Sequence, residues 1–295
     1  MAILAPSDSR ILLHGIANPL AQFQCAEIPR HGTALAGIVV ADRDDLAGWS
    51  PGEARTFQSA HEAVKSAGAN LSMVFSAPYK VKAAVAEAIA ARVSLIIVLT
   101  EHVPVHDAIL LRHLARRAGV TLIGPNSSGL LSPGRLKAGF FVEDICRPGR
   151  IGIISKSGSL AYAVMAEMKS SGFGVSTVVA IGPDAVKGID FREPLSLFQS
   201  DPETDAIVLL GEVGGGDEEN AASFIARSIT KPVIAFVSGR SVPVGQNMGH
   251  ANALAGLGHG DHATKVGALA SAGVMVAQNI GDILFMLKAV DMRPT

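Results

Sequence analysis

The chain is poor in cysteine, in aromatic side chains and in charge, and each shortage excludes a class of protein. Cys25 and Cys146 are the only two cysteines in 295 residues, and their spacing fits neither a metal site nor a redox pair, so we expect reduced thiols and a cytoplasmic protein. A formal net charge of −1 without a basic block argues against nucleic acid or an anionic membrane as partner. No apolar run reaches the ~18 residues of a membrane span, and residues 1–10 do not resemble a secretion signal.

Aliphatic residues are abundant, and their pattern predicts an α/β protein. Apolar residues make up 48% of the chain and aromatics only 5%, so the core must consist mainly of Ala, Val, Ile and Leu. Short apolar runs alternate with helical periodicity, which is typical of βαβ units and a parallel sheet buried on both faces. The expected strands are 11–13, 36–40, 71–75, 95–99, 120–123, 151–154, 175–181, 206–210, 233–237 and 274–277, and the clearest helices are 79–92, 105–118, 160–170, 218–228, 263–271 and 282–290.

Residues 124–150 interrupt this alternation with three clusters of turn-forming residues, the last of them Arg147-Pro148-Gly149. Such a concentration of proline and glycine indicates a domain boundary. We expect one domain over residues 1–130 and a second over residues 131–295, each with its own βα series. No internal repeat or low-complexity tract is present.

Two strand-to-helix turns are candidate anion sites. The turn from Gly15 to Ala21 follows the first strand, where a dinucleotide-binding sheet holds a pyrophosphate. It keeps only the first glycine, and Pro19 lacks an N–H group, so an ordinary turn is at least as good an interpretation. The second turn, Ser155-Lys156-Ser157-Gly158-Ser159, precedes a helix whose unpaired N–H groups suit a phosphate. A plain serine cap is the alternative there.

A long loop containing His250 follows the strand expected at 233–237, at the end of a parallel sheet where ligands bind. Small neighbours leave the imidazole room to move, and a neutral imidazole is a competent nucleophile near pH 7. A surface histidine without a role is the alternative. His259, Asp261 and His262 follow closely, but without further ligands at fixed spacing they favour a solvated turn, and we expect no metal site.

Taken together, these segments resemble the α subunit of succinyl-CoA synthetase and related ADP-forming acid–CoA ligases. The resemblance runs in order along nearly the whole chain. The matching segments are 100–104, 123–134, 152–158, 210–215 and 248–251, which resemble Thr-Glu-Gly-Ile-Pro, Ile-Gly-Pro-Asn-Cys-Pro-Gly, Gly-Ile-Val-Ser-Arg-Ser-Gly, Ile-Gly-Glu-Ile-Gly-Gly and the loop with the active histidine. Each motif is unspecific by itself, whereas five in the same order are specific.

The resemblance implies a fold, a reaction and a set of site residues. It implies an N-terminal Rossmann-like CoA-binding domain and a C-terminal flavodoxin-like ligase domain. A small carboxylic acid becomes an acyl phosphate, a thiol displaces the phosphate, and His250 carries the phosphoryl group to or from ADP. Glu212 orients the histidine, and Ser157, Gly158 and Ser159 hold the phosphate. ATP and Mg²⁺ belong to a partner β subunit with an ATP-grasp fold. The implied CoA contacts are Gly15, Ala17, Asn18, Arg43, Ser76, Pro78, Thr100, Glu101 and Asn126.

Departures from the family pattern concentrate in the CoA half. Ala17, Pro19 and Leu20 replace Thr, Ser and Gln of the first turn, and the acidic segment 42–45 offers only Arg43 in place of a lysine. Ser127 replaces a cysteine and Asn252 a glycine. We therefore keep two alternatives: a ligase that transfers the acyl group to another acceptor such as an amine, and a ligand-binding relative without catalysis.

Overall fold

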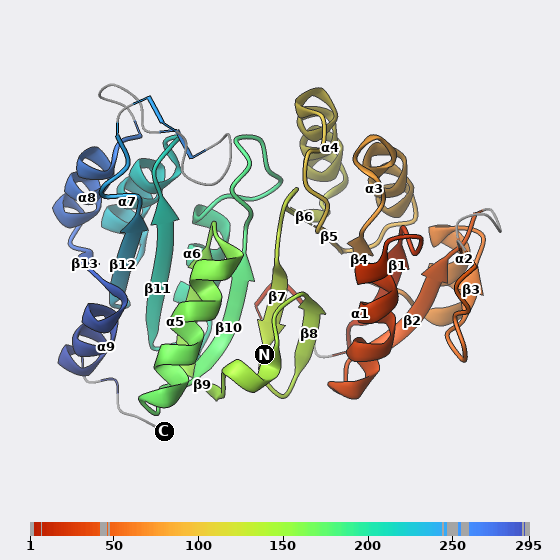
Figure 1. Ribbon diagram of the computed structural model, residues 1–295, viewed down its shortest axis with the longest axis horizontal. Coiled ribbons are helices and arrows are strands. Elements are labelled where there is room, and N and C mark those ends of the chain that lie inside the picture. Colours follow the sequence, from red (N-terminus) through yellow and green to blue (C-terminus); the bar gives the residue numbers. More distant parts are fainter. Residues whose placement is uncertain are drawn as a thin grey trace. The chain divides into compact units, whose positions relative to one another are not determined.

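The structure is a computed structural model that describes residues 3–6, 8–41, 46, 48–243, 245–246, 253–254, 260–290 and 292. Its chain divides into two compact units, shown in Figure 1. Unit 1 comprises Met1–Phe141 and Val186–Ile189, and unit 2 comprises Val142–Ala185 and Asp190–Thr295. Within the described residues, no helix has both the length and the apolar character that crossing a membrane requires.

Unit 1 is built on a parallel sheet of short aliphatic strands. The strand order is β3-β2-β1-β4-β5-β6, the order of a Rossmann fold. β1 lies between β2 and β4, so the chain changes direction across the sheet at β1 and β4. The bounds are β1 (Arg10–His14), α1 (Pro19–Arg30), β2 (Ala34–Val39), β3 (Thr56–Phe57), α2 (Ala60–Ala67), β4 (Leu71–Val74), η2 (Pro78–Lys80), α3 (Val81–Ala90), β5 (Leu95–Val98), α4 (Val105–Ala118), β6 (Thr121–Ile123), β7 (Gly129–Ser132) and β8 (Leu136–Gly139).

The helices of unit 1 carry clear start and stop signals. The Ser59 hydroxyl accepts a hydrogen bond from Glu62 N at 3.2 Å and caps α2, and Gly68 ends that helix in the left-handed conformation. One face of the sheet, including Leu12 and Ile96, packs into a continuous buried cluster with α2, α3 and α4. This packing leaves the carboxyl ends of β1 and β4 at the edge where ligands bind in such folds.

Unit 2 contains a second parallel series, with strands in the order β13-β12-β11-β9-β10. That order is flavodoxin-like, and its change of direction lies between β9 and β11. In Figure 1, α5 lies in front of these strands, with α6 and α7 behind them. The bounds are η3 (Glu143–Ile145), β9 (Pro148–Ser155), α5 (Gly158–Ser170), β10 (Val175–Ala180), α6 (Arg192–Ser200), β11 (Ala206–Glu212), α7 (Asp217–Ser228), β12 (Val233–Ser238), α8 (His262–Ser271), β13 (Met275–Ala277) and α9 (Ile280–Ala289).

Three features were not expected from sequence. The boundary expected after residue 130 falls inside the β7–β8 hairpin, and the whole hairpin groups with unit 1. There Lys137 N donates to Thr33 Oγ1 at 2.9 Å and Lys137 Nζ donates to Gln24 Oε1 at 2.8 Å. Residues 186–189 also belong to unit 1, where Gly188 N donates to Gly124 O at 2.9 Å. Helices α2 and α6 had no predicted counterpart; with eight and nine residues they are short and give a weak periodic signal.

Candidate functional site

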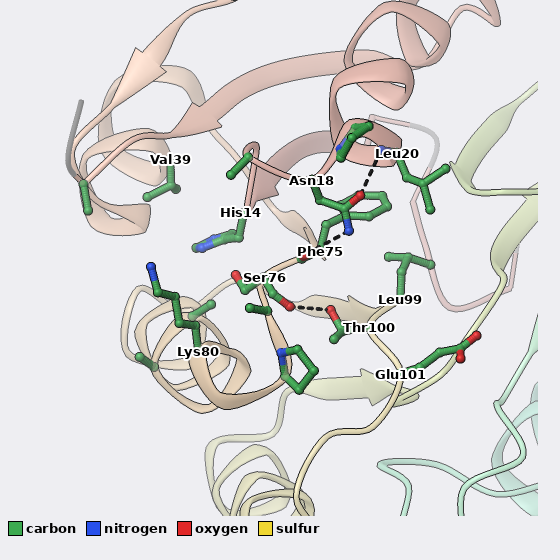
Figure 2. Close-up of a pocket in the computed structure, with 18 of the residues that line it drawn as sticks. His14, Asn18, Leu20, Val39, Phe75, Ser76, Lys80, Leu99, Thr100 and Glu101 are labelled. Carbon is green, nitrogen blue, oxygen red and sulfur yellow. Dashed lines mark hydrogen bonds between the residues drawn. The ribbon is translucent and has the colours of Figure 1, made fainter. Parts of the chain in front are cut away.

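A cavity of about 840 Å³ opens at the carboxyl ends of the unit 1 strands. It lies at the change of direction between the neighbouring strands β1 and β4, and the segments that follow both strands contribute to its wall. The lining residues, several of them drawn in Figure 2, are His14, Gly15, Ala17–Leu20, Val39, Ala41, Phe75–Pro78, Lys80, Ala83, Ala84, Glu87, Leu99–Glu101 and Phe140. We call this the unit 1 cavity. Most of its wall is apolar, as expected for a pocket that binds an organic molecule.

The first turn of the cavity wall requires glycine at position 15. Gly15 has a φ of +81°, and a Cβ there would lie 2.3 Å from Ser76 N, so any side chain would collide with the backbone after β4. Asn18 then caps α1, with its Oδ1 accepting from Leu20 N at 2.9 Å. Ala21 N and Gln22 N both donate to Asn18 O. Pro19 has no N–H group, and the N–H groups of the next three residues already donate to Asn18. The start of α1 therefore has few N–H groups left to bind a pyrophosphate.

Most of the CoA contacts expected from sequence meet in this cavity. Gly15, Ala17 and Asn18 line it from the first turn, and Ser76, Pro78, Thr100 and Glu101 line it from the segments after β4 and β5. Thr100 Oγ1 donates to Ser76 O at 2.8 Å and ties those two segments together.

Asn126 does not line the cavity. Its backbone N–H donates to Thr100 O at 3.0 Å, and its φ of +58° follows the cis peptide Gly124–Pro125. Asn126 therefore contacts the Thr100 segment through its backbone. Ser127, the residue in place of a cysteine, has its Oγ accepting from Gly129 N at 2.9 Å. Arg43 lies outside the described residues.

His14 is a cavity residue that the sequence reasoning missed. It is the last residue of β1, and its side chain is 3% exposed. Burial lowers the pKa of His14 to about 4, so the imidazole is neutral at pH 7. A polar residue at the carboxyl end of a buried strand was the available signal.

The second cluster lies at the change of direction of unit 2, where the turn after β9 leads into α5. Ser157 caps the helix, and its Oγ accepts from Leu160 N at 3.3 Å. Ser155 Oγ in turn accepts from Ser157 N at 3.1 Å and fixes the turn. The capped N–H belongs to Leu160, so Gly158 and Ser159 contribute N–H groups of the first helical turn, which have no partner within the helix. An anion can bind there.

Glu212 ends β11 next to this turn and is 3% exposed. The neighbouring strands align Leu210 with Ser155, and Lys156 N donates to Leu210 O at 3.1 Å. The Glu212 carboxylate and the start of α5 therefore belong to one edge of the sheet. Lys156 Nζ lies 3.8 Å from Glu212 Oε1.

Lys156, which belongs to the same turn, is directed toward buried carboxylates. Its side chain is 3% exposed, and its ammonium lies 3.5 Å from Glu218 and 3.6 Å from Asp217 as well. Burial disfavours the charged form, but the carboxylates of Glu218, Glu212 and Asp217 outweigh that effect and raise the pKa of Lys156. Lys156 thus neutralises buried acids below the site.

Both ends of the segment that contains His250 are anchored beside Glu212. At its start, Val213 N donates to Ser238 O at 3.2 Å, and at its end Gly214 N donates to Gly260 O at 2.7 Å. A Cβ on Gly260 would lie 2.7 Å from Gly215 O, so this close approach requires glycine. His250 itself lies outside the described residues.

Asp261 and His262, considered above for a metal, have structural partners. Asp261 caps α8, with its Oδ1 accepting from Thr264 N at 2.8 Å, and His262 Nε2 lies 3.1 Å from Val237 O. His259 lies outside the described residues. Among those that are described, no group of three or more His, Cys, Asp or Glu side chains is arranged to hold a metal ion.

Solved structures share this two-unit fold. The chain superposes on an ATP citrate lyase from Methanosaeta concilii with a TM-score of 0.87 and 21% identity, covering 98% of this chain and 51% of that one. An acetyl-coenzyme A synthetase from Ca. Korarchaeum cryptofilum gives a TM-score of 0.77 with 22% identity, covering 99% of this chain and 62% of that one. The chain thus spans about half to two thirds of these larger proteins, and the likeness concerns the fold.

Sequence relatives match over nearly their full length. The family model of the succinyl-CoA ligase-like flavodoxin domain matches residues 148–290. The α subunit 2 of an ADP-forming succinate–CoA ligase from Archaeoglobus fulgidus is 40% identical, with 94% of this chain and 96% of that one covered. The malate–CoA ligase α subunit of Methylorubrum extorquens is 35% identical over 95% of each chain. With the Rossmann-like and flavodoxin-like units, the turn before α5 and Glu212 in place, this chain belongs to the α subunits of the succinyl-CoA ligase family.

Proposed function

We propose that the chain is the α subunit of an ADP-forming acid–CoA ligase and that His250 carries the phosphoryl group. The observation that supports this most is the meeting, at one edge of the unit 2 sheet, of three elements: the Ser157 turn, Glu212, and both anchors of the segment containing His250. A phosphate acceptor, an anion site and a carboxylate that orients an imidazole are the parts that such a transfer requires.

In the proposed reaction each step exchanges one group. The His250 imidazole attacks the γ-phosphorus of ATP and ADP leaves. A carboxylate oxygen of the acid then takes the phosphoryl group and restores the neutral imidazole. Finally the CoA thiolate attacks the acyl carbon of the acyl phosphate, and inorganic phosphate leaves. The N–H groups of Gly158 and Ser159 hold the phosphate during transfer, and Glu212 holds the ring through a hydrogen bond.

The partner in this proposal is a β subunit with an ATP-grasp fold that binds ATP and Mg²⁺. CoA occupies the unit 1 cavity, which brings together Gly15, Asn18, Ser76 and Thr100. The free, buried Cys25 and Cys146 suit a reducing cytoplasm. Transfer to an amine is not favoured, because the relatives described above are CoA ligases. The ligand-binding alternative is not favoured either, since those relatives are enzymes.

Acyl-CoA formation tests the proposal. The chain is purified with its β subunit and incubated with ATP, Mg²⁺, CoA and single acids, among them succinate, malate and sulfoacetate. We expect one acid to give acyl-CoA together with equimolar ADP and phosphate, and omission of either subunit to abolish the reaction. In a parallel incubation that also contains a primary amine, formation of the amide with no acyl-CoA would contradict the assignment of CoA as acceptor.

A further inference from the structure

His14 lines the unit 1 cavity and carries a buried polar atom. The side chain is 3% exposed, yet its Nε2 has no hydrogen-bond partner among the residues that the structure describes. Figure 2 shows the imidazole between Val39 and Lys80, at the end of the cavity away from Thr100 and Glu101. Leaving such an atom unsatisfied destabilises a fold, and native proteins rarely do so without a functional reason.

Its position within the fold separates His14 from other buried polar groups that lack partners. Ser72 Oγ and Thr177 Oγ1 are likewise buried and unpartnered among the described residues, but neither residue lines the cavity. Their small hydroxyls lie within β4 and β10. His14 is a larger group placed at a strand end, where a bound molecule can supply its missing partner.

The surroundings of His14 indicate which part of a ligand it meets. Small apolar side chains line the cavity from the end of β2, with Val39 and Ala41, and from α3, with Ala83 and Ala84; α3 also contributes Glu87. In a Rossmann sheet the end of β2 is the nucleoside side of a bound nucleotide. A neutral imidazole nitrogen can donate or accept, depending on the tautomer, and the edge of a purine base presents both complements. Lys80 lines the same region and can attract a phosphate on the ribose.

We propose that His14 Nε2 forms a hydrogen bond with the purine base in the nucleotide half of the thiol substrate. The inference rests on the proposed function, because CoA is a thiol joined to an adenine nucleotide. It gives His14 a positioning role, in which the base end is fixed near β2 and α3 while the thiol end extends toward other parts of the cavity wall. The contact contributes affinity for the nucleotide half and none for the pantetheine half.

Isothermal titration of the full chain with three probes tests this inference. The probes are CoA, its nucleotide half adenosine 3′,5′-bisphosphate, and its other half 4′-phosphopantetheine. We expect His14→Leu to weaken binding of CoA and of the bisphosphate roughly five- to tenfold, the effect of one lost hydrogen bond, and to leave 4′-phosphopantetheine unchanged. His14→Gln, whose amide reaches a similar position, should restore most of the affinity.

Controls separate this contact from a general structural effect. Ser72→Ala removes another unpartnered buried group and should leave all three affinities unchanged. The His14 Nε2 resonance, followed by ¹⁵N NMR, should shift on addition of the bisphosphate and not with 4′-phosphopantetheine. Equal affinities for CoA in wild type and His14→Leu, or equal losses for both halves, would overturn the role of His14 alone. Absence of CoA binding by the wild-type chain would instead overturn the assignment of CoA to this cavity, and the inference with it.

Discussion

At the scale of single residues, the proposed chemistry depends on two buried side chains, His14 and Glu212. His14 is neutral because its surroundings exclude water, and Glu212 lies among charges that hold its position. Lys156 contacts Glu212, Asp217 and Glu218 at 3.5 to 3.8 Å. A positive charge shared among three carboxylates keeps this region ordered without placing a cation at the phosphate site.

Burial of His14 makes the stability of the chain depend on pH. Because the pKa is about 4 in the folded chain and near 6.5 when unfolded, the unfolded state binds a proton first as pH falls. Stability is therefore lost between about pH 6.5 and pH 4. From pH 8 to pH 5 this single group should cost about 2 kcal/mol of unfolding free energy.

Urea unfolding of wild type and His14→Leu at pH 8 and pH 5 isolates this contribution. The difference in unfolding free energy between the two proteins should change with pH by that amount, with the variant losing less stability on acidification. The charged groups that line the cavity, Lys80, Glu87 and Glu101, are present in both proteins. A difference independent of pH would show that His14 is not buried as a neutral imidazole.

Glu212 should matter for phosphoryl transfer far more than for folding. In Glu212→Gln the shape is kept and the charge that orients an imidazole is lost, while Lys156 keeps Asp217 and Glu218 as partners. We expect phosphorylation of His250 to slow by roughly 10²- to 10⁴-fold, measured by rapid quench with labelled ATP and the β subunit. Glu219→Gln, on the first turn of α7, is the matched control and should stay within a few-fold of wild type. Similar rates for both variants would argue against the orienting role.

At the scale of secondary-structure elements, the start of α5 combines a cap with an anion site. Ser157 Oγ accepts from Leu160 N, so Ser157→Ala should lower the unfolding free energy by about 1 kcal/mol. The same change loosens the turn that presents Gly158 and Ser159, so the rate of His250 phosphorylation should fall as well.

Ser159→Ala provides the comparison for Ser157→Ala. Ser159 is the second residue of α5, and in the proposal its backbone N–H rather than its hydroxyl holds the phosphate. The unfolding free energy of the Ser159→Ala variant should differ from that of wild type by about a few tenths of a kcal/mol at most, since alanine is well tolerated inside a helix. Equal destabilisation by the two variants, measured by denaturant unfolding, would mean that the Ser157 cap does not fix the start of α5.

The elements were largely predictable from sequence because their signals are local. Buried parallel strands appear in the sequence as aliphatic runs. The candidate site residues were sought in the segments that follow β1, β4 and β9, where the strand order changes direction. Lys156 could not be placed, because the acids that surround it come from β11 and α7, more than fifty residues away. Helices α2 and α6 are too short to give a clear periodic signal. The grouping of the β7–β8 hairpin with unit 1 involves contacts of Lys137 with Thr33 and Gln24.

At the scale of the whole molecule, the chain contains two sheets whose points of reversal each hold one half of the proposed chemistry. The cavity of unit 1 suits a nucleotide thiol, and the edge of unit 2 suits phosphoryl transfer. The departures in the first turn, where Asn18 and Pro19 leave α1 few free donors, weaken any phosphate contact at that helix. In the proposal, contacts of the base with His14 and of CoA with the Ser76 and Thr100 segments then contribute more of the binding free energy.

The most direct test of the account is phosphate on His250. The chain is mixed with its β subunit, Mg²⁺ and γ-labelled ATP, quenched in base, digested and examined by mass spectrometry, beside a His250→Ala variant. We predict acid-labile, base-stable phosphate on the peptide containing His250, its loss on addition of ADP or of the correct acid and CoA, and no label and no turnover in the variant. Normal turnover by His250→Ala, or label on another residue, would contradict the proposed phosphoryl shuttle.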